Sequence, residues 1–149
     1  LANESLRRGA QNGPPGQMIG HASLWELERR FQAHGLDPTA AYDERAMRTT
    51  WRKHTEAWLR HAANALAYGI TSGTSVLDVD AIVIDGSMCQ PLLAELLAAT
   101  QKAMAGYDWQ GLWQPALHQG LIGSDARALG GALLPLHALF GADRGVFIK

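Results

Sequence analysis

Apolar residues recur at helical spacing in the first half of the chain. Ser23 and Glu26 have the Ser-x-x-Glu spacing of a capping box, and the apolar positions beside them lie three and four residues apart: Leu24, Leu27 and Phe31. This pattern predicts an amphipathic helix that ends near Gly35, with Asp37-Pro38 as its stop.

A longer helical pattern follows from about Tyr42 to Tyr68. Its apolar positions fall on or near one stripe, whereas most of the charged residues fall off it: the stripe contains Met47, Trp51, Trp58, Leu59, Ala62 and Leu66. An amphipathic helix of this length needs a broad partner surface for its apolar face, and a sheet is the usual one.

The second half alternates between short apolar runs and helical patterns. The β-branched run Ala81–Ile84, bounded by Asp85-Gly86-Ser87, predicts a strand that is buried on both faces. Pro91 is well placed as the first residue of a helix that stops at Gly106. Residues 116–123 then predict a second short strand.

The last pattern predicts a helix capped by Asp125, kinked by Pro135 and ended by Gly141. Residues 145–149 could add an edge strand. The order helix, strand, helix, strand, helix predicts an α/β layered domain with parallel neighbouring strands and right-handed crossovers.

The segment before the first predicted helix has a different character. Residues 1–11 are typical of a strand end followed by a basic turn at Arg7-Arg8-Gly9. The breaker cluster Asn12-Gly13-Pro14-Pro15-Gly16 fits neither a helix nor a central strand. We therefore interpret residues 11–17 as an exposed loop or as a place where chain is missing.

Composition adds limits on function and location. The 149 residues include 13 Lys plus Arg and 14 Asp plus Glu, and the net charge of −1 argues against binding of DNA, RNA or an anionic membrane by this stretch alone. No apolar run approaches the roughly 20 residues that span a bilayer. The start at Leu1 shows neither a signal peptide nor an initiator Met, so we expect the chain to be part of something longer.

Cys89 is the single cysteine, which excludes an intrachain disulfide and a Cys-rich zinc site. A reducing cytoplasm is its natural setting. The histidines predict no metal site, because His54 and His61 are seven residues apart whereas two ligands on one helix are typically four apart.

The turn Asp85-Gly86-Ser87 is the candidate site, because ligands bind at the carboxyl ends of strands in α/β sheets. Its glycine would let the backbone approach a ligand, and Ser87 could donate a hydrogen bond. The alternative is a structural turn in which Gly86 supplies an unusual φ and Ser87 caps the next helix. Both interpretations stay open here.

Small and aromatic residues suggest close contacts elsewhere. The pair Gly130-Gly131 lies inside the last predicted helix, and we expect tight packing against another backbone rather than a ligand. Trp25, Trp51 and Trp58 are expected in the core or in an interface. A loop subunit contact is the expectation for Trp109 and Trp113.

Several strings together resemble the C-terminal half of the ROK family, which comprises bacterial sugar kinases and sugar-responsive transcriptional repressors. They are AIVIDGS at 81–87, GLIG at 120–123 and ARALGGALL at 126–134, with SLRRG at 5–9 and ASLWELE at 22–28 upstream. The resemblance implies that residues 1–149 form the second lobe of an actin-like, ribonuclease-H-like ATPase fold. The N-terminal lobe and any DNA-binding domain would lie outside the sequence.

Departures from the family pattern shape the functional hypothesis. Members with a structural zinc carry a His and cysteines where this chain has residues 12–17, so the resemblance implies that the zinc is absent or that this stretch is missing. Kinases of the family have two glycines where this chain has Asp85-Gly86, and a carboxylate there would repel a polyphosphate. The family's catalytic aspartate and first phosphate loop belong to the other half, so no catalytic residue is assigned here.

The resemblance therefore favours the sugar-sensing and dimerisation portion of a transcriptional regulator, with Asp85, Gly86 and Ser87 as the ligand-binding residues. The alternative is the C-terminal lobe of an ATP-dependent hexose or amino-sugar kinase, for which ATP and Mg would be the cofactors. A further alternative is a non-catalytic interaction module. The implied partners are a sugar or sugar phosphate, a second copy of the protein, and DNA only through an upstream domain, with no membrane.

Overall fold

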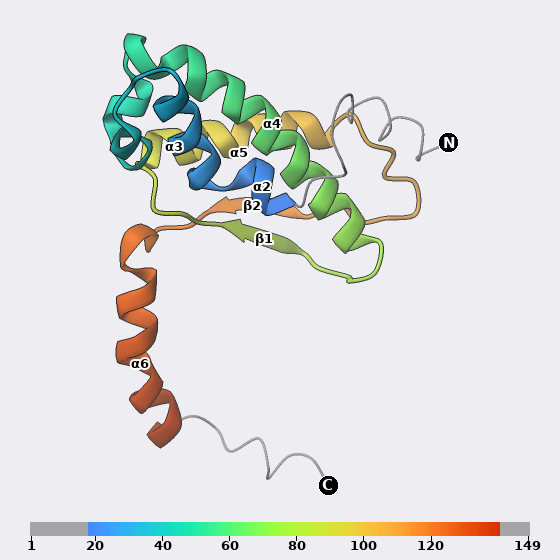
Figure 1. Cartoon of the computed structure of the whole chain (residues 1–149). Coiled ribbons are helices and arrows are strands. Elements are labelled where there is room, and N and C mark those ends of the chain that lie inside the picture. The colour runs from blue at the N-terminus through green and yellow to red at the C-terminus, as the bar shows by residue number, and fades with distance from the viewer. Residues whose placement is uncertain (1–17, 141–149) are drawn as a thin grey trace, which may run out of the picture.

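The computed structural model describes residues 18–140 and shows helices stacked over a short parallel sheet (Figure 1). The elements, in chain order, are α2 (Met18–Ala22), α3 (Leu24–Ala33), the 3-10 turns η1 (Pro38–Tyr42) and η2 (Glu44–Met47), α4 (Thr49–Thr74), β1 (Ala81–Ile84), α5 (Gln90–Met104), β2 (Ala116–Gln119), η3 (Gly123–Asp125) and α6 (Ala126–Phe140). The predictions for residues 1–17 and 141–149 lie outside the described residues.

Helix α3 confirms the first predicted helix. The Ser23 hydroxyl accepts a hydrogen bond from the Glu26 N–H at 3.4 Å, as a cap should. The Glu26 carboxylate does not complete a capping box, because it is bound at 3.1 Å by the guanidinium groups of both Arg29 and Arg30.

The long helix begins later and ends later than the predicted span of 42–68. Residues 38–47 instead form the two 3-10 turns, and Arg48 is extended (φ −78°, ψ 153°) directly before α4. Asp43 explains the delay, because its carboxylate accepts from the Arg45 N–H at 2.8 Å and starts η2 rather than a continuous helix.

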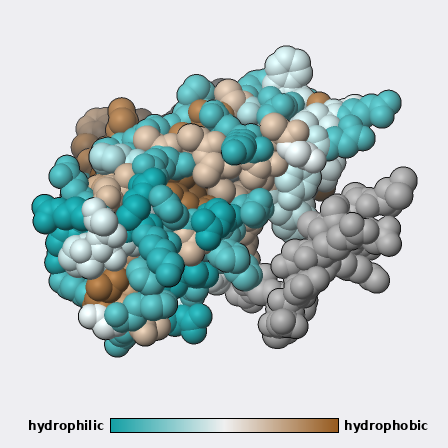
Figure 2. Space-filling model, turned by 90° about the horizontal axis from the view of Figure 1, so that it is seen from above, coloured by the Kyte–Doolittle hydropathy of each residue, from teal (hydrophilic) through white to brown (hydrophobic). Residues whose placement is uncertain are grey.

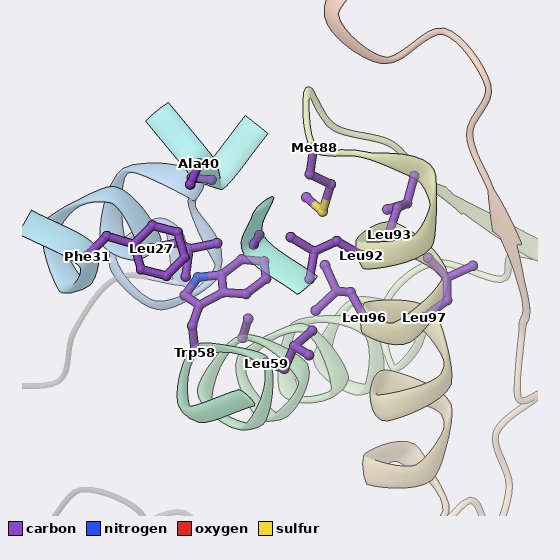
Figure 3. Packing of buried hydrophobic residues seen from close by; sticks show 13 residues of the cluster. Leu27, Phe31, Ala40, Trp58, Leu59, Met88, Leu92, Leu93, Leu96 and Leu97 are labelled. Carbon is purple, nitrogen blue, oxygen red and sulfur yellow. The ribbon is translucent and has the colours of Figure 1, made fainter. Parts of the chain in front are cut away.

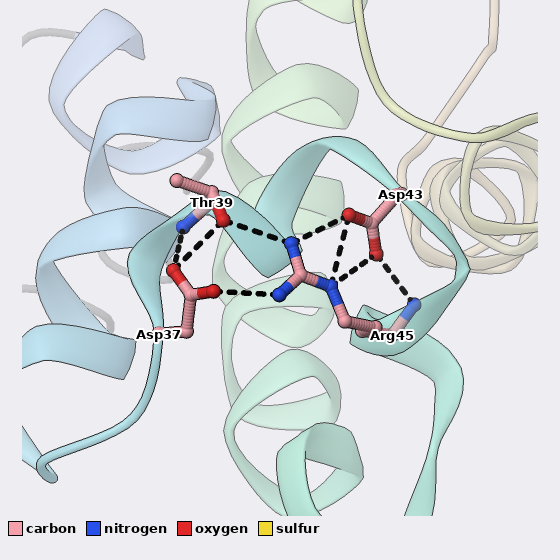
Figure 4. A network of polar contacts seen from close by, with 4 residues as sticks. All are labelled: Asp37, Thr39, Asp43 and Arg45. Atoms are coloured by element: carbon pink, nitrogen blue, oxygen red, sulfur yellow. Dashed lines mark hydrogen bonds and ion pairs between the residues drawn. The ribbon is translucent and has the colours of Figure 1, made fainter.

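A clasp of four polar residues holds these two turns together (Figure 4). The Arg45 guanidinium donates to Asp37 at 2.6 Å, to Asp43 at 2.7 Å and to the Thr39 hydroxyl at 2.8 Å. Hydrogen bonds from the Thr39 side chain and backbone, followed by the one from Arg45, lower the pKa of the Asp37 carboxyl group. Hydrogen bonds from the Arg45 side chain and backbone lower the pKa of the Asp43 carboxyl group. The clasp fixes the chain reversal that brings α3 beside α4.

The predicted strand, helix and strand are confirmed as a parallel unit, but the second strand, predicted at 116–123, ends at Gln119. β1 pairs with β2 in parallel, with Ala81 opposite Ala116 and Ile84 opposite Gln119, and α5 forms the crossover. Pro91 lies in the first turn of α5, as expected.

The prediction that β1 is buried on both faces is wrong. Ile82 and Ile84 are half-buried under the helices, whereas Ala81 and Val83 are exposed on the other face, Val83 by 65%. The reason is that the helical layer formed by α4 and α5 lies on one side of the sheet only (Figure 1). Within the described residues, the second face of the sheet has no cover.

The core lies between α3, α4 and α5, and Trp58 is at its centre (Figure 3). Trp58 is fully buried, and its indole N–H donates to the Ser23 carbonyl at 3.1 Å. Around it gather the buried side chains of Leu27, Phe31, Leu59, Met88, Leu92, Leu93 and Leu96. A smaller cluster of Ala67, Ile70 and Met104 contacts the sheet through Ile82, Ile84 and Leu117.

The other tryptophans differ in burial. Trp51 is half-buried, and Trp25 is exposed on α3 below the Arg29 guanidinium. Trp109 is half-buried and donates to the Met104 carbonyl at 3.0 Å, whereas Trp113 is exposed. The subunit contact expected of the 109–113 loop stays a prediction.

Helix α6 projects away from the rest of the molecule (Figure 1). It begins at Ala126, directly after Asp125, and continues through Pro135 to Phe140. The tight packing expected at Gly130 and Gly131 is absent among residues 18–140, because a Cβ at either position would meet no atom within 4 Å.

The surface seen from the helical side is largely hydrophilic, with hydrophobic residues in patches (Figure 2). No helix within residues 18–140 combines the length and the apolar character that a bilayer crossing requires.

The junction of α3 and α4 contains a pair of histidines that makes stability depend on pH. The rings of His34 and His54 lie 4.0 Å apart, and burial followed by the charges of His34, Lys53 and Arg30 lowers the pKa of His54. Below pH 6.5 the folded state therefore binds fewer protons at His54 than the unfolded state does. The contribution of neutral His54 to the free energy of unfolding is fully present above pH 6.5, and it is lost as the pH falls from 6.5 through the lower pKa of the folded state.

We expect the urea midpoint to fall between pH 7.5 and pH 5.5, and to fall less in the variant His54→Gln. The variant His118→Gln, which changes an exposed residue on β2, is the control and should follow the wild type. Equal pH dependence of all three proteins would contradict this account.

Candidate functional site

The candidate turn lies where the two parallel strands end. Asp85 follows the last residue of β1, and Gly120 follows the last residue of β2. Because both strands run in the same direction, these two ends meet at one edge of the sheet. The prediction that Asp85, Gly86 and Ser87 occupy the carboxyl end of a strand is therefore confirmed.

The Asp85 carboxylate binds three backbone N–H groups at this edge. It accepts from Gly86 at 2.8 Å within its own turn, from Ile122 at 3.2 Å and from Gly123 at 3.1 Å in the turn after β2. These hydrogen bonds, with that of Gly123 first, lower the pKa of the Asp85 carboxyl group. Asp85 is ionised at neutral pH and joins the two strand ends.

Gly120 allows this close approach. A Cβ at residue 120 would lie 2.7 Å from the Asp85 Oδ2 and closer still to the Asp85 Cβ and Cγ. Gly123 also has a structural role, because its φ of +61° is a conformation that side chains disfavour. Sequence reasoning missed both roles, because it placed Gly120 and Gly123 inside the second predicted strand, whereas β2 ends at Gln119.

Two details of the structural alternative are wrong. Gly86 is not among the described glycines with positive φ, and the unusual φ belongs to Gly123 instead. Ser87 does not cap α5, because the N-cap residue is Cys89, which makes no side-chain cap bond. Gly86 and Ser87 therefore line the site without forming the expected cap.

A cavity of about 740 Å³ adjoins the turn. Its wall combines the candidate turn with the start of α6: Asp85, Gly86, Ser87, Gly123, Ser124, Ala126, Arg127 and Ala128. Ser87, Ser124 and Arg127 bring hydroxyl and guanidinium donors to this wall. Since the Asp85 carboxylate is already bound by backbone donors, the wall offers hydrogen-bonding groups for a polar ligand rather than a free base.

Within residues 18–140 no group of three His, Cys, Asp or Glu side chains is placed to hold a metal ion. The stretch at residues 12–17, where the resemblance would place a zinc, lies outside the described residues. Cys89 is half-buried and free.

The role of the Asp85 carboxylate is testable in acid. Its folded pKa lies below 3.8, so its contribution to stability is present above pH 3.8 and is lost as pH falls through the lowered folded value. Asp85→Asn places an amide opposite backbone donors, and we expect a lower melting temperature at pH 7. The difference from wild type should shrink toward pH 2.5.

Asp78→Asn is the matched control for this prediction, because Asp78 is an exposed carboxylate upstream of the same strand. It should melt like the wild type across the series. A constant difference between Asp85→Asn and wild type from pH 7 to pH 2.5 would show that the ionised carboxylate is not what holds the turn.

Comparisons of the chain with models of known protein families, with curated proteins and with solved structures found no match. The resemblance to the ROK family therefore depends on the sequence strings named above.

Proposed function

We propose that this chain is the sugar-sensing and dimerisation portion of a ROK-family transcriptional regulator. The βαβ unit from β1 to β2 and the two turns after its strands coincide with the strings that resemble the family. On this proposal the described residues form part of an actin-like second lobe, and the uncovered face of the sheet is where the lobe continues. The ligand is a sugar or a sugar phosphate.

The observation that carries the proposal is the state of the Asp85 carboxylate. Converging backbone N–H groups at a turn before a helix are a typical phosphate site, because they offer positive partial charge to an anion. In this chain the N–H groups of Gly86, Ile122 and Gly123 already bind the chain's own carboxylate. A nucleotide phosphate would have to displace this carboxylate and approach its charge, which favours a regulator that lacks kinase activity.

The alternative of an ATP-dependent sugar kinase is supported by the adjoining cavity. Its volume of about 740 Å³ suits a small polar molecule, and Arg127 with Ser87 and Ser124 would contact it. ATP and Mg would then be the cofactors. In the kinase alternative Gly86 and Ser87 would lie near the adenosine, with Gly130-Gly131 packed beside it, whereas in the regulator Asp85, Gly86 and Ser87 contact the ligand.

DNA binding is assigned to an upstream domain, since the net charge of −1 gives this stretch no excess of cations for a phosphate backbone. On the same proposal the protein works in the cytoplasm as a homo-oligomer. A non-catalytic interaction module remains the third alternative, and it predicts no sugar-dependent change in thermal stability.

Calorimetric titration of the full-length protein tests the proposal. We expect binding of one sugar or sugar phosphate, a higher melting temperature with that sugar, and no binding of ATP with Mg. Tight ATP binding with phosphorylation of the sugar would replace the proposal by the kinase. No response to a panel of sugars and sugar phosphates would replace it by the interaction module.

The variant Asp85→Gly separates the first two alternatives further. In a regulator it frees the backbone N–H groups and should create measurable ATP affinity, whereas a kinase that already tolerates Asp85 should change its ATP affinity only modestly. Asp78→Gly serves as the control for a glycine next to the same strand, and far-UV circular dichroism confirms that both variants are folded.

A further inference from the structure

Two histidines from different helices lie side by side at the end of α3. His34 is the C-cap residue of α3, and His54 lies in the second turn of α4. The centres of their rings are 4.0 Å apart, and the ring planes are inclined by 41°. The spacing of His54 and His61 predicts no metal site, whereas the ring beside His54 comes from another helix, 20 residues earlier in the chain.

A hydrogen bond determines which nitrogen of His34 is available to a ligand. The His34 Nδ1 lies 2.8 Å from the Arg30 carbonyl oxygen. Because a carbonyl oxygen can only accept, Nδ1 carries the proton, and the neutral ring keeps its lone pair on Nε2. Metal-binding histidines typically have such a bond, since it orients the ring and makes the other nitrogen a stronger ligand. His34 is therefore prepared to bind a cation through Nε2.

The core holds the backbone on both sides of this pair. Phe31, which precedes His34 by one turn, is fully buried, and its carbonyl accepts from the His34 N–H at 3.0 Å. Thr55 is also fully buried beside His54, and its hydroxyl donates to the Ala46 carbonyl at 2.8 Å. Ligands on rigid elements are already close to their binding geometry. Since His34 is exposed and His54 is half-buried, water can reach both rings.

We propose that His34 and His54 together bind one divalent transition-metal ion, with water at its remaining coordination positions. Imidazole suits Ni²⁺, Cu²⁺ and Zn²⁺, whereas Mg²⁺ and Ca²⁺ take oxygen ligands. No third His, Cys, Asp or Glu within residues 18–140 is placed to complete the site. The proposal is independent of the proposed function, because both histidines lie outside the turn at 85–87 and outside its adjoining cavity.

The separation of the two rings favours a metal whose ligands stand at right angles. With metal–nitrogen bonds of about 2.0–2.1 Å, two imidazoles have their ring centres about 4.5 Å apart at 90° and about 5.2 Å apart at the tetrahedral angle. The observed 4.0 Å is nearer the first value. Square-planar and tetragonal sites are typical of Cu²⁺ and Ni²⁺, whereas Zn²⁺ prefers a tetrahedron. The expected ions are therefore Ni²⁺ and Cu²⁺.

Positive neighbours limit the affinity of the pair. Burial, followed by the charges of His34, Lys53 and Arg30, lowers the pKa of His54, so its ring is neutral at pH 7.5. The charges of Lys53 and Arg30 also repel a bound cation, although the Arg30 guanidinium is paired with the Glu26 carboxylate at 3.1 Å. We expect weaker binding than at a closed site with three or four protein ligands.

Calorimetric titration of the untagged full-length protein with Ni²⁺ at pH 7.5 tests the pair. Ni²⁺ is the probe because it does not oxidise the free Cys89, and we expect one equivalent to bind, with no binding of Mg²⁺. His34→Gln and His54→Gln should each raise the dissociation constant for Ni²⁺ at least tenfold. His61→Gln is the matched control, because His61 lies on the same face of α4 two turns after His54, and it should stay within twofold of the wild type.

Thermal unfolding gives a second measurement, since a bound ion joins the end of α3 to α4. When free Ni²⁺ is about a hundred times the wild-type dissociation constant, the melting temperature of the wild type should rise by about 5–10 °C. The same Ni²⁺ concentration should raise that of His34→Gln or His54→Gln by about half as much or less.

Three results would overturn the proposal. The first is a wild-type protein that binds no Ni²⁺. The second is wild-type affinity in either His34→Gln or His54→Gln, which would mean that the ion is not shared by the two rings. The third is an equal loss of affinity in His61→Gln, which would place the ion along α4. None of these results bears on sugar or ATP binding, so the proposed function is tested separately.

Discussion

Replacing Trp58 by alanine is expected to lower the free energy of unfolding by about 3–5 kcal/mol, the range measured for large aromatic residues in protein cores. Trp58 is fully buried where α3, α4 and α5 meet, so its removal leaves a cavity that three helices line (Figure 3). The Ser23 carbonyl also loses its indole donor. Urea unfolding monitored by circular dichroism measures the effect.

Trp25→Ala is the control for this prediction. Trp25 lies on the exposed face of α3 with 61% of its surface in water, so its replacement should cost well under half as much. Trp58→Phe should fall between the two, because it keeps most of the apolar volume but loses the hydrogen bond to Ser23. A Trp58→Ala protein as stable as Trp25→Ala would contradict the core described here.

The elements that the sequence predicts well are those in which local signals agree. Ser23 begins α3, Pro91 lies in the first turn of α5, and Ala81–Ile84 forms a strand, because capping, proline geometry and β-branched runs act over a few residues. The start of α4 was missed because the Arg45 guanidinium links Asp37 and Asp43, eight and two residues away. Such a clasp leaves no periodic pattern in the sequence.

In the candidate site, too, local features could be predicted from the sequence, whereas contacts between distant residues could not. The position of Asp85-Gly86-Ser87 at a strand end follows from the sequence, whereas the partners of the carboxylate do not. Ile122 and Gly123 are 37 and 38 residues away, and they reach Asp85 only because β1 and β2 pair in parallel. The burial of β1 was overestimated for a related reason, since an apolar run does not reveal whether one or two faces of a sheet are covered.

Replacing Gly120 by alanine is expected to destabilise the protein by about 1–3 kcal/mol, the usual cost of overpacking. The added Cβ would lie within 2.7 Å of the Asp85 Oδ2 and would overlap the Asp85 Cβ, which is fixed to the backbone. The strand ends must therefore separate, and the hydrogen bonds from Ile122 and Gly123 to Asp85 weaken. Urea unfolding measures the loss.

A double-mutant cycle identifies the cause of that loss. Asp85→Gly removes the Cβ and the carboxylate, so Gly120→Ala should cost little stability in the Asp85→Gly protein. The double variant should therefore lose less free energy of unfolding than the sum of the losses in the two single variants. Gly73→Ala is the control, because a Cβ at Gly73 meets nothing within 4 Å, and it should be neutral or stabilising within α4. Additive losses of stability from the substitutions at residues 85 and 120 would mean that Asp85 and Gly120 are not in contact. Such a result would also contradict the argument that the Asp85 carboxylate occupies this site and excludes a phosphate.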